Sequence, residues 1–197
     1  ATIETRIAMG DTAIDNALAF HEGKDLPNKV VWVIYLMSLR ESANSLFKEA
    51  ITLQRPSNIV FNSSPKYDAY FDKAERIFPV AIGKAGVMMM DGLLSYFDKK
   101  YKSKVHEGPI VVSNPQENNS KYKFKHIISS HPTPDITSVN AAREVLDYIK
   151  GSNENDLVVF LISGGGSSLL SYPVDGVSID DKIILTEILL ASGCNIN

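Results

Sequence analysis

The run Ser163-Gly164-Gly165-Gly166-Ser167-Ser168 directly follows the wholly apolar segment Leu157–Ile162. Three successive glycines carry no Cβ atoms, so their backbone N–H groups can approach a ligand closely and turn towards one anion. The flanking serine hydroxyls add hydrogen-bond donors. We therefore predict an anion-binding loop, with a tight strand-to-helix turn without a ligand as the alternative. The run has neither the Gly-Lys-Ser/Thr ending of a P-loop nor the Gly-x-Gly-x-x-Gly dinucleotide pattern.

A second glycine-bearing turn, Gly83-Lys84-Ala85-Gly86, follows the short apolar segment Ile77–Ile82. A lysine in the first turn of a helix lies at the positive end of the helix dipole, which is unfavourable unless an anion is close by. The position of Lys84 therefore indicates a phosphate or carboxylate partner. A lysine that is simply solvated stays open as the other interpretation.

A third candidate is the loop His131-Pro132-Thr133-Pro134-Asp135, just past the segment Lys125–Ser129. Its two prolines restrict the backbone. His131 can donate a hydrogen bond to a phosphate or substrate oxygen. Two roles are equally open for Asp135, because a carboxylate at this place can bind Mg²⁺ or cap the helix that follows.

The elements that must position these loops alternate between strands and helices. Short apolar runs predict strands over 77–82, 110–112, 125–129 and 157–162, the last in the middle of a parallel sheet. Helical spacing predicts helices over 39–51, 84–97, 139–149 (capped by Thr137 or Ser138) and 178–193, with Asn58–Tyr70 as a loop. The expected fold is α/β, a three-layer Rossmann-like domain with a largely parallel sheet. Both glycine turns then fall at the carboxyl ends of strands, where such sheets bind ligands.

The two ends of the chain are predicted differently. Residues 1–38 are expected to be a helical extension whose pattern is interrupted by Gly10, and residues 39–197 the main domain. Val30–Leu39 is strongly apolar but has only about half the roughly 20 residues that span a bilayer, so a buried helix or strand is expected. In the last helix, Ser178 is the predicted cap. Its predicted buried face consists of Ile184, Ile188 and Leu189.

The composition bounds the class of protein. Hydrophobic residues make up 44% and charged residues 22%, which is ordinary for a globular domain. A net charge of −3 argues against a nucleic-acid partner, and the basic cluster Lys99, Lys100, Lys102 and Lys104 is predicted to be a solvated helix end.

The single cysteine, Cys194, excludes an intramolecular disulfide and is expected to pack as a small apolar residue. Acidic residues near the amino end make a poor targeting signal, so we expect a cytoplasmic protein without a membrane partner.

Several short sequence motifs follow one another in a specific order and spacing over about Leu39–Gly193. They are Val80-Ala81-Ile82-Gly83-Lys84-Ala85, Gly108-Pro109-Ile110-Val111-Val112, His131-Pro132-Thr133-Pro134-Asp135, Leu161-Ile162-Ser163-Gly164-Gly165-Gly166-Ser167, Asp181-Lys182, Leu185-Thr186 and Ser192-Gly193. Together they resemble the glycerate 2-kinase family, whose members carry a second, C-terminal domain often called MOFRL. The order and spacing of several blocks are far more specific than any one block.

The resemblance implies ATP-dependent phosphorylation of D-glycerate at its C2 hydroxyl, with Mg²⁺, in a cleft between two domains. It implies that Lys84 stabilises the transferring phosphoryl group or the substrate, and that Ser163, Gly164, Gly165, Gly166 and Ser167 hold phosphate or the substrate carboxylate. His131 and Asp135 would line the same cleft, with Asp135 as the candidate Mg²⁺ ligand. Gly86 and Ser168 depart mildly from the family, which commonly has alanine at both places.

The resemblance covers only part of such a kinase, because the family continues into the second domain beyond this chain. We therefore expect the chain alone to be inactive, and the bare surface left for the missing domain can favour self-association into a homo-oligomer. Two alternatives remain. One is a nicotinamide-dependent hydroxypyruvate or hydroxy-acid oxidoreductase, and the other is an anion-binding fragment without catalysis.

Overall fold

The computed structural model describes residues 3–24, 39–116 and 119–193. By its internal contacts the chain divides into two compact units, residues 1–51 and 52–197. The first unit holds α1 (Ile3–His21) and α2, whose bounds are Leu39–Leu53. The helical character predicted for the amino-terminal part is thus seen over α1, which runs through Gly10 without a break. The predicted element at Val30–Leu39 falls, except for its last residue, outside the described residues, and so does Cys194.

The second unit is built on a four-stranded sheet. Its strands are β1 (Ile77–Ile82), β2 (Ile110–Ser113), β3 (Lys125–Ile128) and β4 (Leu157–Ile162). All neighbouring strands pair in parallel, and their order is β3-β2-β1-β4. The prediction of a parallel α/β sheet is confirmed. The prediction that 157–162 lies in the middle of the sheet is wrong, because β4 pairs on one side only within the described residues and Phe160 and Ile162 are exposed.

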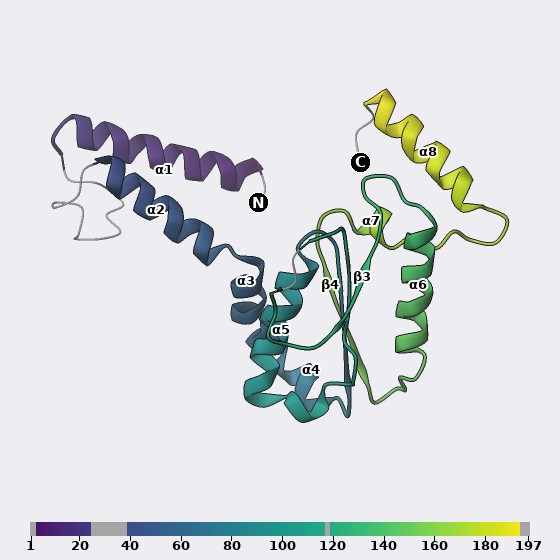
Figure 1. Cartoon of the computed structure of the whole chain (residues 1–197). Helices are drawn as coiled ribbons and strands as arrows, with labels where there is room; N and C mark the ends of the chain where they lie inside the picture. Colours follow the sequence, from purple (N-terminus) through teal and green to yellow (C-terminus); the bar gives the residue numbers. More distant parts are fainter. Residues whose placement is uncertain (1–2, 25–38, 117–118, 194–197) are drawn as a thin grey trace. The chain divides into compact units, whose positions relative to one another are not determined.

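Helices cover both faces of this sheet, as the three-layer prediction requires (Figure 1). Side chains of a strand alternate between faces, so neighbouring positions of β1 enter different cores. Ile77 and Ala81 pack with α5 (Gly86–Lys100) and α4 (Asp68–Lys73). Val80 and Ile82 pack with α6 (Ile136–Ile149) and with Leu169 of α7 (Gly166–Leu169). β1 is buried along its whole length and anchors both cores.

The segment predicted as a loop, Asn58–Tyr70, is mostly helical. It contains α3 (Pro56–Ser63), the 3-10 turn η2 (Ser64–Tyr67) and the start of α4. Pro56 follows the end of α2 at Leu53 and begins the next helix, because proline at the first position loses no hydrogen bond and has a helical φ. Long-range packing also stabilises these helices, because Phe71 of α4 is buried in the core on the α5 side of the sheet.

The last described helix is α8 (Ile179–Ser192). Its start is as predicted: the Ser178 side chain accepts from the backbone N–H of Asp181, and the Asp181 carboxylate accepts from the backbone N–H of Ser178. Its end at Gly193, in the left-handed conformation, is also confirmed. The predicted buried face is wrong for the described structure, because α8 has no buried residue there and Ile184, Ile188 and Leu189 are exposed.

Gly92 allows α3 and α5 to approach closely. A Cβ atom at this position would lie 2.2 Å from the carbonyl oxygen of Ser57 and 2.8 Å from its Cα atom. We expect Gly92→Ala to lower the free energy of unfolding by about 2 kcal/mol, since overpacking outweighs the helix propensity gained. Urea denaturation measures this. Gly151→Ala, where nothing lies within 4 Å, is the matched control and is expected to be neutral or slightly stabilising.

Candidate functional site

The two glycine-bearing turns lie side by side at one edge of the sheet. β1 and β4 pair with Ile82 opposite Ile162, so the turns that follow them leave the sheet together. Strands β2 and β3 lie on one side of β1, and β4, which comes later in the chain, lies on its other side. The direction in which successive strands are added to the sheet therefore reverses between β1 and β4. Open parallel sheets bind ligands at such a switch point, outside the carboxyl ends of the strands.

Hydrogen bonds join the two turns. The backbone N–H of Lys84 donates to the carbonyl oxygen of Gly164 over 2.9 Å, and that of Ala85 donates to the Ser163 hydroxyl over 3.1 Å. The same hydroxyl donates to the carbonyl oxygen of Ile82 over 3.3 Å. Ser163, predicted as a ligand donor, therefore has its hydroxyl engaged in holding the turns together. Its role towards a ligand stays a prediction.

The backbone of the glycine-rich loop offers free donors. Within the described residues, the N–H groups of Gly164, Gly165, Gly166 and Ser167 make no hydrogen bond. Gly165 has φ +90°, and Gly166 opens the short helix α7. A left-handed residue followed by a helical one aims successive N–H groups into one concavity, which suits an anion. The Ser167 side chain is exposed, whereas Ser168 is buried and donates to the carbonyl oxygen of Gly165.

His131 lies against this loop. A Cβ atom at Gly165 would come within 2.7 Å of Cδ2 and 3.0 Å of Nε2 of the imidazole, so only glycine leaves room for the ring. The third predicted loop therefore meets the glycine-rich loop. Three separate segments of the sequence, which provide Lys84, His131 and Ser163–Ser167, are thus brought to one edge of the sheet.

The Lys84 side chain is exposed and, among the described residues, has no hydrogen-bond or ion-pair partner. The backbone of Lys84 is bonded to the loop whose four N–H groups have no partner among the described residues, so positive charge gathers at this edge and favours a polyanion such as a phosphate chain. The chemistry that this arrangement can support is therefore the binding of a phosphate group and the stabilisation of charge on it.

Asp135 is the N-cap of α6, which confirms one of the two roles left open for it. The other predicted caps, Thr137 and Ser138, are wrong by two and three residues. Its carboxylate accepts from the backbone N–H of Thr137 over 2.8 Å and from the hydroxyls of Ser130 and Thr137. Burial works to raise the pKa of this carboxyl group, but the hydrogen bonds outweigh it and the pKa is lowered. Asp135 is thus held ionised in its capping role.

Asp135 is the candidate Mg²⁺ ligand that the sequence predicts in this site. Both carboxylate oxygens of Asp135 already accept hydrogen bonds. No group of three or more His, Cys, Asp or Glu side chains that could hold a metal is found among residues 3–24, 39–116 and 119–193. Coordination by Asp135 stays a prediction, and the oxygen that accepts from Ser130 keeps a lone pair for it.

Removal of the Asp135 cap is expected to cost about 1 kcal/mol of stability near neutral pH. Because the folded-state pKa is lowered, this contribution is fully present above the unfolded value of 3.8 and is lost as the pH falls through the lower folded value. Urea denaturation of wild type and Asp135→Ala should give a constant difference from pH 7 to pH 5 and a smaller one at pH 3. Asp147→Ala, on the same helix, should change stability by less than about 0.5 kcal/mol.

A cavity of about 420 Å³ adjoins this site at the carboxyl ends of β2 and β3. Among its lining residues, only His131 and its neighbours belong to a loop predicted from the sequence as a candidate site. Its polar lining residues are Asn114, Ser129, Ser130, His131, Thr133 and Thr137. The sequence did contain a signal for Asn114, because this polar residue comes shortly after a predicted strand, at the same end of the sheet as Gly83 and Ser163.

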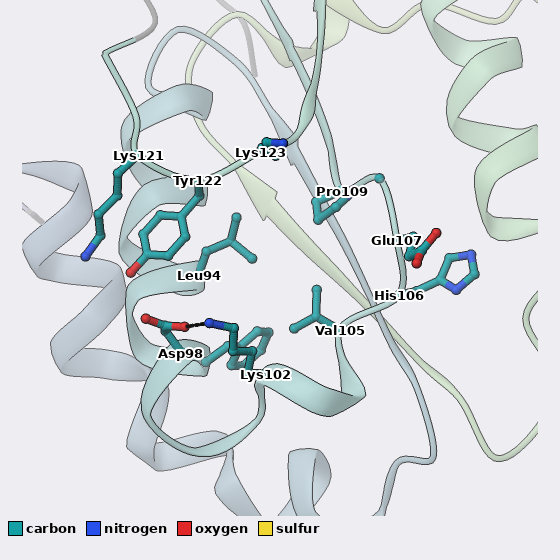
Figure 2. Close-up of a pocket in the computed structure, with 12 residues that line it drawn as sticks. Leu94, Asp98, Lys102, Val105, His106, Glu107, Pro109, Lys121, Tyr122 and Lys123 are labelled. Atoms are coloured by element: carbon teal, nitrogen blue, oxygen red, sulfur yellow. Dashed lines mark ion pairs between the residues drawn. The ribbon is translucent and has the colours of Figure 1, made fainter.

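A second cavity, of about 530 Å³, lies at the opposite, amino end of β2, before Ile110 (Figure 2). Leu94, Val105 and Pro109 form apolar parts of its wall, and Lys102 pairs with Asp98 over 2.7 Å. No predicted site residue lines it. The candidate chemistry is therefore confined to the carboxyl edge. None of the described helices has both the length and the apolar composition needed to cross a bilayer.

Comparison with known proteins gives concordant matches. The model of a family described as "Domain of unknown function (DUF4147)" matches residues 42–197. A D-glycerate 2-kinase of Thermotoga maritima is 33% identical over 159 residues, covering 81% of this chain and 36% of that protein. A protein of Agrobacterium vitis with the provisional name of a hydroxypyruvate reductase is 32% identical over 161 residues, covering 82% and 34%. The crystal structure of a glycerate kinase from Thermotoga maritima matches with a TM-score of 0.68 at 33% identity, covering 80% and 36%. The chain thus spans about a third of the length of these relatives.

Proposed function

Because the chain belongs to the DUF4147 family, and because it resembles glycerate kinases in both sequence and fold, we propose that it is the phosphate-binding part of a glycerate 2-kinase. The reaction is the transfer of a phosphoryl group from ATP to the C2 hydroxyl of D-glycerate. The observation that carries the proposal is the meeting of Lys84 with four free backbone N–H groups at the switch point of the sheet.

This chain's residues contribute to phosphoryl transfer mainly by positioning and by neutralising charge. The N–H groups of Gly164–Ser167 hold phosphate oxygens, and the Lys84 ammonium group stabilises the negative charge on the transferred group. His131 packs on Gly165, and an N–H of its imidazole can donate a hydrogen bond to a phosphate oxygen held there. These donors are fixed before the ligand arrives, because the two turns are hydrogen-bonded to each other.

Mg²⁺ is implied as the usual companion of ATP, and when bound it would neutralise phosphate charge and orient the donor. From this chain, Asp135 is the proposed ligand. A single carboxylate suits Mg²⁺, which commonly keeps several waters and takes its remaining ligands from phosphate oxygens.

We propose that a second domain completes the site. Since the chain spans about a third of its relatives, groups that bind the glycerate carboxylate are expected from the remaining two thirds. The chain alone is accordingly expected to bind phosphate without turnover. Self-association and a cytoplasmic location stay predictions.

An oxidoreductase acting on hydroxypyruvate is the second candidate, favoured by the provisional name of the Agrobacterium vitis relative. Against it, the turn after β1 reads Gly83-Lys84-Ala85-Gly86, which lacks the Gly-x-Gly-x-x-Gly pattern of a dinucleotide pyrophosphate site. The lysine there is better suited to a terminal phosphate.

The test uses a full-length protein that carries these residues. Incubation with ATP, Mg²⁺ and D-glycerate is expected to give 2-phosphoglycerate, resolved from the 3-isomer by ³¹P NMR. Formation of the 3-isomer alone, or of no phosphoglycerate at all, would contradict the proposal. Oxidation of NADH or NADPH with hydroxypyruvate, in the same preparation, would support the second candidate instead.

A further inference from the structure

The cavity at the carboxyl ends of β2 and β3 has a lining of hydroxyl, amide and imidazole groups, without Lys, Arg, Asp or Glu in the described part of the chain. The nearest carboxylate is that of Asp135, which accepts from the hydroxyls of Ser130 and Thr137, two of the lining residues. This negative charge also compensates the positive end of α6. The cavity therefore favours a neutral hydroxylated group over an anion.

The remaining wall of the cavity is apolar. Pro115, Ile128 and Pro132 contribute it, and Ile128 is 45% exposed. A ligand with a flat apolar ring and a hydroxylated part matches such a mixed lining. D-Glycerate matches poorly, because it is small and carries a carboxylate for which the cavity offers no cationic side chain.

The side chain of Asn114 also favours a ligand with hydroxyl groups. Its side-chain oxygen is shielded from solvent and has no hydrogen-bond partner among the described residues. Such an acceptor is costly unless a donor reaches it, and the terminal torsion of asparagine is soft enough to turn the oxygen towards the cavity that the residue lines. A ribose hydroxyl is a donor of the required type.

The position of the cavity links it to the phosphate site. His131 lines the cavity and also lies against Gly165 in the glycine-rich loop. A ligand that fills the cavity can therefore extend a phosphate chain past His131 to the free N–H groups and Lys84. We propose that this cavity holds the nucleoside of the phosphate donor, with Asn114 as a binding residue for the ribose. The inference rests on the proposed function in that it takes the donor to be a nucleotide.

The test measures binding of the nucleoside and of the phosphate chain separately. Adenosine and inorganic tripolyphosphate are titrated into the 197-residue chain by calorimetry, for wild type, Asn114→Leu, Thr133→Val and Lys84→Met. We expect Asn114→Leu to weaken adenosine binding about tenfold, through the loss of one buried hydrogen bond, and to change tripolyphosphate binding by less than about twofold. Thr133→Val should also weaken adenosine binding. Lys84→Met should do the reverse and weaken tripolyphosphate only.

Thermal unfolding of each variant shows that a loss of binding is not a loss of fold, and Asn114→Leu is expected to be as stable as wild type because the oxygen removed has no partner. The inference is overturned if adenosine does not bind, if folded Asn114→Leu and Thr133→Val bind it as wild type does, or if D-glycerate displaces it. Glycerate phosphorylation by the full-length protein is measured separately, so a failure there is distinguishable from a failure here.

Discussion

Replacing Lys84 by methionine in the full-length protein is expected to slow phosphoryl transfer to D-glycerate by on the order of 10²–10³-fold, the usual loss when one preorganised charge-stabilising donor is removed. The reason is its position beside four backbone N–H groups that have no partner within the described residues. The effect is expected mainly in kcat, because the lysine stabilises charge that is spread over the phosphoryl group during transfer. Steady-state kinetics with ATP and D-glycerate varied in turn measure it.

The matched control is Lys123→Met. This lysine is also exposed, but it lines the cavity at the amino end of β2, away from the candidate site (Figure 2). Its replacement is expected to leave kcat within about twofold of wild type. If both substitutions had the same small effect, Lys84 would be a solvated lysine, the interpretation that the sequence left open.

Replacing Gly83 by alanine is expected to lower the free energy of unfolding by about 3 kcal/mol, which combines backbone strain with overpacking. Gly83 has φ +116°, and a Cβ atom there would lie 2.6 Å from the carbonyl oxygen and 2.8 Å from the carbonyl carbon of Ser163. Backbone atoms cannot rotate away as a side chain does. The substitution therefore has to push apart the two turns that form the candidate site.

Gly108→Ala separates the two causes. Gly108 also has a positive φ, +73°, but no atom lies within 4 Å of the added Cβ. It is expected to cost only about 1 kcal/mol, the price of the left-handed conformation alone. Urea denaturation of the two variants gives the comparison. Equal losses would mean that the close contact between the turns is not needed for stability.

The strands could be predicted closely from the sequence where an apolar run is bounded by polar or glycine residues. Ile77–Ile82 and Leu157–Ile162 have the predicted bounds in the structure. The order of the strands could not be predicted, because periodicity reports burial and not neighbours. A wholly apolar strand is typical of the middle of a sheet, yet β4 lies at the edge of the described sheet.

The helices that were missed depend on long-range packing. The run Asn62-Ser63-Ser64-Pro65 is typical of a turn, and the helical structure there depends on contacts with other elements. Phe71 fills the core on the α5 side, and α3 packs so closely on α5 that Gly92 has room for no side chain. A single sequence does not reveal such a contact, since Ser57 and Gly92 are far apart along the chain.

For the candidate site, the sequence predicted which loops share an edge but not how they are joined. The carboxyl ends of parallel strands meet, so Lys84, His131 and the glycine-rich loop could be expected together. Local patterns do not specify side-chain hydrogen bonds between distant segments. The Ser163 hydroxyl between the two turns and the cavity beside Asn114 therefore emerged only from the structure.

The central claim is that free backbone N–H groups of the glycine-rich loop bind phosphate. The most direct measurement is a titration of the ¹⁵N-labelled chain with inorganic tripolyphosphate, followed by amide chemical shifts. The largest saturable shifts are expected at Gly164, Gly165, Gly166 and Ser167, because these amides change from having no partner in the described structure to donating hydrogen bonds. Shifts confined to the cavity at the amino end of β2, around Lys121 and Lys123, or no saturable shift at all, would contradict the claim.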